Sequence, residues 1–141
     1  MLTSEQVEQF IDGYVECALW ADCWPTEAET LTNESWESGG REHLTIRPDA
    51  RERMAQDCRA FCEEMVSDLR LYADERSYDP SQGSVYSYAG HDFWLTRSGH
   101  GAGFWDRGLG ELGDRLTDAA RRYGSPDDHT PFDCGDGTAD C

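Results

Sequence analysis

Apolar positions at the beginning of the chain recur with the period of a helix. Thr3 and Gln6 have the spacing of a capping box, and the positions behind them are apolar at every third or fourth residue. These apolar residues are Val7, Phe10, Ile11, Tyr14, Val15, Ala18 and Leu19. Pro25 disfavours a helical conformation at the residue before it, so the pattern predicts an amphipathic helix over residues 4–22.

A second helical pattern follows a polar segment. Residues 25–44 are rich in Thr, Ser, Glu and Gly and show no regular period, which predicts a loop. Pro48 suits the first turn of a helix, and apolar residues recur at helical spacing after it. They are Met54, Cys58, Phe61, Met65, Leu69 and Tyr72. We therefore expect a second long helix over residues 48–73.

The composition changes to strand-forming residues after the turn signal at residues 79–83. The glycine-rich segment 98–101 separates two apolar segments, 93–97 and 102–106. This arrangement predicts an antiparallel hairpin over residues 92–106 with a glycine-rich tip.

A third helical pattern begins near Leu109 and is stopped by Gly124 and Pro126. The order of elements predicts an α+β fold with two long helices, a small antiparallel sheet built on the hairpin, and a C-terminal helix packed on one face. We expect one domain over residues 1–124, able to fold alone, and an acidic polar tail over residues 125–141. The predicted core residues are Phe10, Tyr14, Phe61, Met65, Phe93, Leu95, Phe104, Leu112 and Leu116.

Charge limits the classes of function. The chain of 141 residues has 29 acidic and 12 basic residues, which gives a net charge of −17. The summed field of such a protein repels nucleic acids and anionic membranes, so we expect direct binding to neither. The N-terminus lacks a basic region before an apolar run, and no stretch approaches the roughly 18 apolar residues that span a membrane. We therefore expect a cytoplasmic protein whose six cysteines are free thiols.

One segment resembles a known group of proteins. Residues 89–108 read AGHDFWLTRSGHGAGFWDRG, and together with residues 112–117 they resemble a motif in small proteins of tailed phages and prophages. Residues 16–20 and 57–58 resemble two weaker landmarks of those proteins, whereas residues 131–141 depart from their pattern. The resemblance implies a phage origin, a compact α+β fold and the cytoplasm of a host cell. It implies no catalytic residue.

Acidic residues are concentrated at the N-terminus. Residues 1–40 contain nine acidic residues and no basic residue. Carboxylates three or four residues apart on a helix lie about 5–6 Å from one another, which is comparable with the spacing of phosphates along a nucleic-acid strand. With the phage resemblance, this predicts an accessory protein that mimics nucleic acid and inhibits a basic, nucleic-acid-binding host protein. The predicted partner-binding residues are Glu5, Glu8, Asp12, Glu16, Asp22, Glu27 and Glu29. Alternatively, the charge serves solubility alone.

Two groups of residues could form an enzyme active site or a metal site, which is a further alternative for the function. Histidine, carboxylate and arginine residues lie close together between His91 and Arg107, where they could form an acid–base pair or a metal site. The candidate residues of this hairpin are His91, Asp92, Arg97, His100 and Asp106. Strand alternation would send them to opposite faces, so we expect no catalytic site.

Cys58 and Cys62 are spaced to share a zinc ion on one helix, but both also suit a hydrophobic core. The alternative is thus a small metal-dependent enzyme or a zinc-stabilised domain. We predict no metal and no cofactor, and the sequence does not indicate an oligomeric state.

Overall fold

The computed structural model describes residues 1–27, 29 and 39–141. Helices make up most of the described chain: α1 (Ser4–Ala21), α3 (Pro48–Glu64), α4 (Val66–Glu75), α5 (Val85–Ser98) and α6 (Glu111–Arg122). The described residues also form three short 3-10 helices: η1 (Pro80–Gln82), η2 (Phe104–Asp106) and η3 (Asp127–His129). The strands are β1 (Thr45–Ile46), β2 (Phe132–Asp133) and β3 (Thr138–Asp140). In the described part of the chain, no helix combines the length and the apolar character needed to cross a membrane.

The first predicted helix is confirmed as α1. The backbone N–H of Gln6 donates to Thr3 Oγ1 at 3.1 Å, and the backbone N–H of Thr3 donates to Gln6 Oε1 at 3.0 Å, which completes the capping box. The last predicted helix is confirmed as α6, which ends just before Tyr123 and Gly124. Of the predicted core residues all are buried except Met65, which is partly buried against the core.

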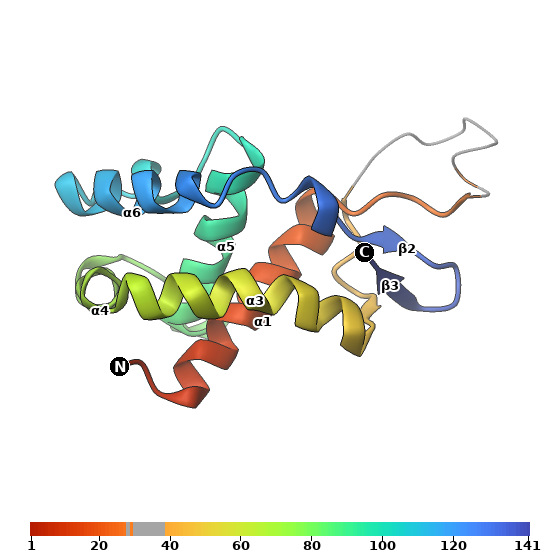
Figure 1. The fold of residues 1–141 in the computed structure, drawn as a ribbon, viewed down its shortest axis with the longest axis horizontal. Coiled ribbons are helices and arrows are strands. Elements are labelled where there is room, and N and C mark those ends of the chain that lie inside the picture. The colour runs from red at the N-terminus through yellow and green to blue at the C-terminus, as the bar shows by residue number, and fades with distance from the viewer. Residues whose placement is uncertain (28, 30–38) are drawn as a thin grey trace.

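The predicted hairpin over residues 92–106 is wrong. Residues 85–98 form helix α5, and residues 104–106 form η2. The side chain of Ser84 caps α5 by accepting from the backbone N–H of Ser87, and Gly99 ends the helix in the left-handed region at φ 79°. Figure 1 shows α5 crossing between α1 and α6, with which it makes contact. A helix covered on several sides carries apolar residues around most of its circumference, so its helical period is weak.

The predicted fold class is therefore wrong, and two further elements differ. The second predicted helix is divided at Met65 into α3 and α4. The sheet is mixed, because β1 pairs with β3 in parallel and β2 pairs with β3 in antiparallel, in the order β1-β3-β2. Each strand has only two or three residues, which is too short for an alternating pattern to be visible in the sequence.

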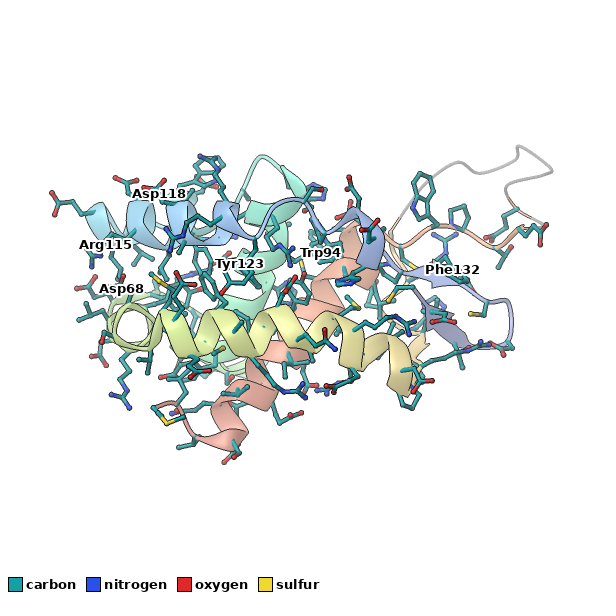
Figure 2. The ribbon with its side chains drawn as sticks, in the orientation of Figure 1. Asp68, Trp94, Arg115, Asp118, Tyr123 and Phe132 are labelled. Carbon is teal, nitrogen blue, oxygen red and sulfur yellow. The ribbon has the colours of Figure 1, made fainter. Side chains whose placement is uncertain are left out.

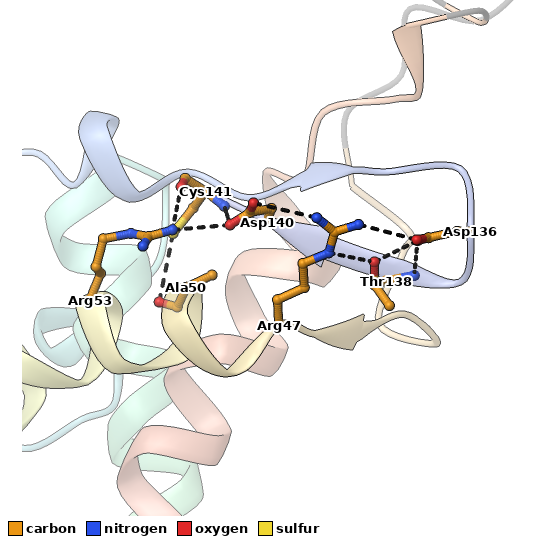
Figure 3. A network of polar contacts seen from close by, with 7 residues as sticks. All are labelled: Arg47, Ala50, Arg53, Asp136, Thr138, Asp140 and Cys141. Atoms are coloured by element: carbon orange, nitrogen blue, oxygen red, sulfur yellow. Dashed lines mark hydrogen bonds and ion pairs between the residues drawn. The ribbon is translucent and has the colours of Figure 1, made fainter.

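The C-terminal segment, expected to be a loose tail, supplies two of the three strands. Ala139 of β3 lies opposite Ile46 and is completely buried. Two arginines of the neighbouring segment hold this end: Arg47 contacts Asp136 and Asp140, and Arg53 donates to Asp140 and to the carbonyl oxygen of Cys141 (Figure 3). These contacts attach the C-terminus to the beginning of α3.

Aromatic rings fill the centre where α1, α3 and α5 meet. The rings of Phe61 and Phe93 are stacked with centroids 4.2 Å apart, and Phe10 packs against both. At the edge of the molecule, Arg115 of α6 forms an ion pair with Asp68 of α4 at 3.0 Å (Figure 2). The other helices thus pack around α5, which carries part of the candidate site.

Candidate functional site: a cleft around Asp92

A cleft of about 770 Å³ opens beside α5. Tyr88, His91, Asp92 and Leu95 share one face of α5 because of their helical spacing, and this face forms the floor of the cleft. The C-terminal end of α1 and the loops that follow α4 and α5 form its walls. The lining residues are Trp20, Ala21, Arg76, Tyr88, His91, Asp92, Leu95, His100, Gly101, Ala102 and Arg107.

Asp92 is the buried centre of the cleft. Its side chain is only 1% exposed. Its Oδ2 accepts a hydrogen bond from the hydroxyl of Tyr72 at 2.6 Å, and its Oδ1 lies 2.9 Å from Nε and 2.8 Å from Nη2 of Arg107. Nε of Arg76 lies 3.7 Å from Oδ2. A buried carboxylate can remain charged only with such partners. Asp92 binds Nε and Nη2 of Arg107 directly, whereas Arg76 is hydrogen-bonded to Tyr72 and Ser77 and lies at ion-pair distance from Asp92.

Each of the two arginines keeps one guanidinium nitrogen unused. Arg76 donates from Nε to the hydroxyl of Tyr72 at 3.2 Å and from Nη1 to the carbonyl oxygen of Ser77. Arg76 Nη2 and Arg107 Nη1 make no hydrogen bond with any described residue. Both side chains are partly accessible, at 13% and 24% exposure. Burial lowers the pKa of Arg107, but the hydrogen bond to Asp92 raises it, and the net change is upward.

Two histidines line the same cleft. Nε2 of His100 lies 2.9 Å from both carboxylate oxygens of Asp22, which also accepts a hydrogen bond from Trp94 Nε1 at 2.5 Å. Nε2 of His91 lies 3.5 Å from Glu16 Oε1. Burial lowers the pKa of His91, whereas the nearby carboxylate of Glu16 raises it, and the net change is downward.

The structure brings together three of the five predicted hairpin residues, His91, Asp92 and His100. Asp106 is exposed on η2. Arg97 is buried elsewhere, where it contacts Asp57 at 3.0 Å and donates to the hydroxyl of Tyr14 and to the carbonyl oxygens of Tyr123 and Gly124. Arg97 thus serves the packing of α1, α3 and α6 against α5.

The prediction missed Trp20, Arg76 and Tyr88 as members of the site. The spacing of Tyr88, His91, Asp92 and Leu95 contained a signal, because residues separated by three and four positions share one face of a helix. A strand divides the same residues between two faces. No comparable signal exists for Arg76 and Trp20, which reach the cleft only through the packing of α4 and α1.

The predicted acidic partner-binding residues form two groups. Glu5, Glu8, Asp12 and Glu16 lie on one exposed face of α1, and Glu27 is also exposed. Several have partners within the chain: Arg51 contacts Glu8 at 2.9 Å and Asp12 at 2.7 Å.

The other two, Asp22 and Glu29, also have partners within the chain. Asp22 binds His100 and Trp94, and Glu29 pairs with Arg41 at 3.1 Å. Of the predicted residues, those on the exposed face of α1 form a row of carboxylates, two of which are paired with Arg51. Their role in binding a partner stays a prediction.

The cysteines lie away from the cleft lining. Cys58 and Cys62 belong to the hydrophobic core, where burial raises the pKa of both thiols, to about 12 for Cys62. Metal binding needs thiolates, which this environment disfavours. Among the described residues, no group of three or more His, Cys, Asp or Glu side chains is placed to hold a metal ion.

Comparisons of the chain with protein-family models, with curated proteins and with solved structures found no match. The resemblance to tailed-phage proteins therefore stays a prediction. The chemistry of the cleft follows from its own residues: two fixed guanidinium groups with unused donors, two histidines and an open aromatic ring. The described lining contains no serine, threonine, cysteine or lysine that could serve as a nucleophile.

Proposed function

We propose that the protein is a small-molecule binding protein whose cleft receives an anionic group, a carboxylate or a phosphate, at Arg76 and Arg107. The observation that carries the proposal is the pair of arginines beside the buried Asp92, because Arg107 binds Asp92, Arg76 binds Tyr72 and Ser77, and each guanidinium keeps a free donor. Guanidinium groups match the planar geometry of carboxylate and phosphate oxygens. Because Asp92 orients Arg107, and Tyr72 and Ser77 orient Arg76, a ligand loses little side-chain entropy by engaging them.

The local charge of the site supports this proposal despite the net charge of −17. Asp92 neutralises one of the two arginines, which leaves one positive charge among these three side chains, while the carboxylates of Asp22 and Glu16 lie against His100 and His91. Exposed charges farther than the Debye length, about 8 Å at physiological salt, are largely screened. Distant carboxylates therefore slow the approach of an anion more than they weaken its contacts with Arg76 and Arg107. Burial lowers the pKa of His91, so protonation of this side chain adds positive charge to the cleft only at acidic pH.

Titration of the 15N-labelled protein with sodium acetate and with inorganic phosphate tests the proposal. We expect saturable NMR shift changes at the Nε–H groups of Arg76 and Arg107 and in the residues around them. Arg76→Gln removes a donor while leaving Arg107 on Asp92, so the protein should stay folded and bind at least about tenfold more weakly.

The matched control is Arg121→Gln, which removes one exposed charge from α6 outside the cleft. It should leave the affinity unchanged. Arg107→Lys provides a second variant, because it keeps a positive charge beside Asp92 but removes the second donor. Non-saturating shifts spread over all arginines, or equal loss in the control, would contradict the proposed site.

A further inference from the structure

We infer that the natural ligand carries a planar aromatic ring next to its anionic group, and that the ring lies against Trp20. This inference rests on the proposed function, because Trp20 lines the same cleft as Arg76 and Arg107, which would hold the anionic group. It adds the chemical class of the ligand: an aromatic carboxylate or an aromatic phosphate.

Trp20 is the open aromatic surface of the cleft. It is the second-last residue of α1 and is 54% exposed, although large aromatic residues are usually well buried. Its ring makes no ring–ring or cation–π contact with the described residues. An indole with a free face offers stacking energy to a planar ligand.

The ring of Tyr88, the other aromatic residue of the lining, already contacts neighbouring side chains. The guanidinium carbon of Arg76 lies 5.2 Å from the ring centroid of Tyr88, and the ring of Tyr78 contacts Tyr88 edge-on at 5.8 Å. Tyr88 therefore positions Arg76, and Trp20 remains available for the ligand. Leu95 and Ala102 add apolar surface to the lining.

The size of the cleft also favours a ligand larger than a bare anion. Its volume of about 770 Å³ falls within the range of about 300–1,000 Å³ that is typical of small-molecule sites. A carboxylate or phosphate at Arg76 and Arg107 fills only a small part of this space. An attached aromatic ring would cover the apolar lining and remove it from water.

Four anions separate the contribution of the ring from that of the charge. Benzoate carries an aromatic ring on a carboxylate, and phenyl phosphate carries one on a phosphate. Cyclohexanecarboxylate has a saturated ring of similar size, and acetate has no ring. We expect benzoate to bind about fivefold more tightly than cyclohexanecarboxylate, with the indole N–H resonance of Trp20 shifting during the titration. The ratio of benzoate to phenyl phosphate affinity then identifies the preferred head group.

Trp20→Leu tests the role of the indole, because leucine keeps an apolar side chain but removes the ring. This variant should lose the preference for benzoate and retain the binding of acetate and phosphate. The matched control is Trp105→Leu, which removes another exposed tryptophan, 44% exposed, outside the cleft lining. It should keep the preference.

The outcomes distinguish this inference from the proposed function. If acetate and phosphate bind at Arg76 but benzoate gains nothing over cyclohexanecarboxylate, the aromatic inference is overturned and the anion site stands. The same conclusion follows if Trp20→Leu keeps the full preference for benzoate. If no anion binds at Arg76 and Arg107, both proposals fail.

Discussion

At the scale of single residues, Asp92 shows how a charged side chain can organise a site. It lies among aromatic and apolar residues in the sequence and is 1% exposed in the fold. Its charge is stabilised by Tyr72 and Arg107, which come from other segments of the chain. Removing one partner of a buried ion pair is costly because the other loses its compensation. Stability and anion binding therefore depend on the same carboxylate.

Asp92→Asn should lower the free energy of unfolding by about 2–3 kcal/mol, because a charge-assisted hydrogen bond is lost on a buried group. Urea denaturation at pH 7 measures the change. The control Asp106→Asn alters an exposed carboxylate on η2 and should change stability by less than about 0.5 kcal/mol. Equal effects of the two substitutions would show that Asp92 does not stabilise the fold.

His91 should make the stability depend on pH. Burial lowers its pKa in the folded protein, so the unfolded chain binds a proton more readily. The contribution of His91 to the free energy of unfolding is therefore fully present above the ordinary histidine pKa of about 6.5, and it decreases as the pH falls below this value. Unfolding of the wild type and of His91→Gln, compared between about pH 7.5 and pH 5, should show a smaller loss in the variant. His43→Gln, at an exposed histidine, should behave like the wild type.

At the scale of elements, the crossing of α1 and α5 depends on two glycines. A Cβ atom on Gly13 would lie 2.0 Å from the carbonyl oxygen of Ser87, and a Cβ on Gly90 would lie 2.0 Å from that of Phe10. The two backbones therefore approach more closely than any larger residue permits. Glycine weakens a helix interior, so its presence at both crossing points is explained by this contact.

Gly90→Ala should separate α1 from α5 and disturb the packing of Phe10 against Phe93. We expect a loss of about 3 kcal/mol or more in unfolding free energy, at the upper end of overpacking effects, because the clash is with backbone. Thermal denaturation followed by circular dichroism measures it. Gly101→Ala places its methyl group in open space and should leave the melting temperature nearly unchanged. A stable Gly90→Ala protein would argue against this helix crossing.

The C-terminal strands are also structural elements of the domain. A chain that ends at Gly124 loses β2 and β3, the buried Ala139 and the partners of Arg47 and Arg53. We expect it to unfold at lower urea concentration than the full chain, because β1 then has no neighbouring strand. Unchanged cooperative unfolding would show that residues 125–141 contribute no stability.

At the scale of the whole molecule, the charge of −17 is distributed unevenly. Many carboxylates pair with arginines that connect distant segments, such as Arg51 with Asp12 and Arg122 with Glu64. The exposed face of α1 keeps its row of carboxylates, although Arg51 offsets part of their charge. Binding to a basic, nucleic-acid-binding host protein, as a phage-encoded inhibitor, therefore stays a prediction for this face.

Recovery of partners from a bacterial lysate at low and high salt tests that prediction. A basic partner should bind at low salt and be released at high salt, because the attraction acts between clustered charges. One variant neutralises the face of α1 by Glu5→Gln, Glu8→Gln, Asp12→Asn and Glu16→Gln. A matched variant neutralises four exposed carboxylates elsewhere by Glu75→Gln, Glu111→Gln, Asp114→Asn and Asp118→Asn. Equal recovery with both variants would mean that net charge, and no specific face, attracts the partner.

The sequence alone determined the elements whose signals are local. The capping box and apolar period define α1, the glycine and proline after Tyr123 mark the end of α6, and large apolar residues identify most of the core. Only the tertiary structure decided the rest. Helix α5 is covered by neighbouring helices, so its sequence lacks the contrast between faces that reveals a helix. The strands are too short to show a period, and the cleft joins Trp20, Arg76, Asp92 and Arg107, whose meeting depends on how separate segments pack.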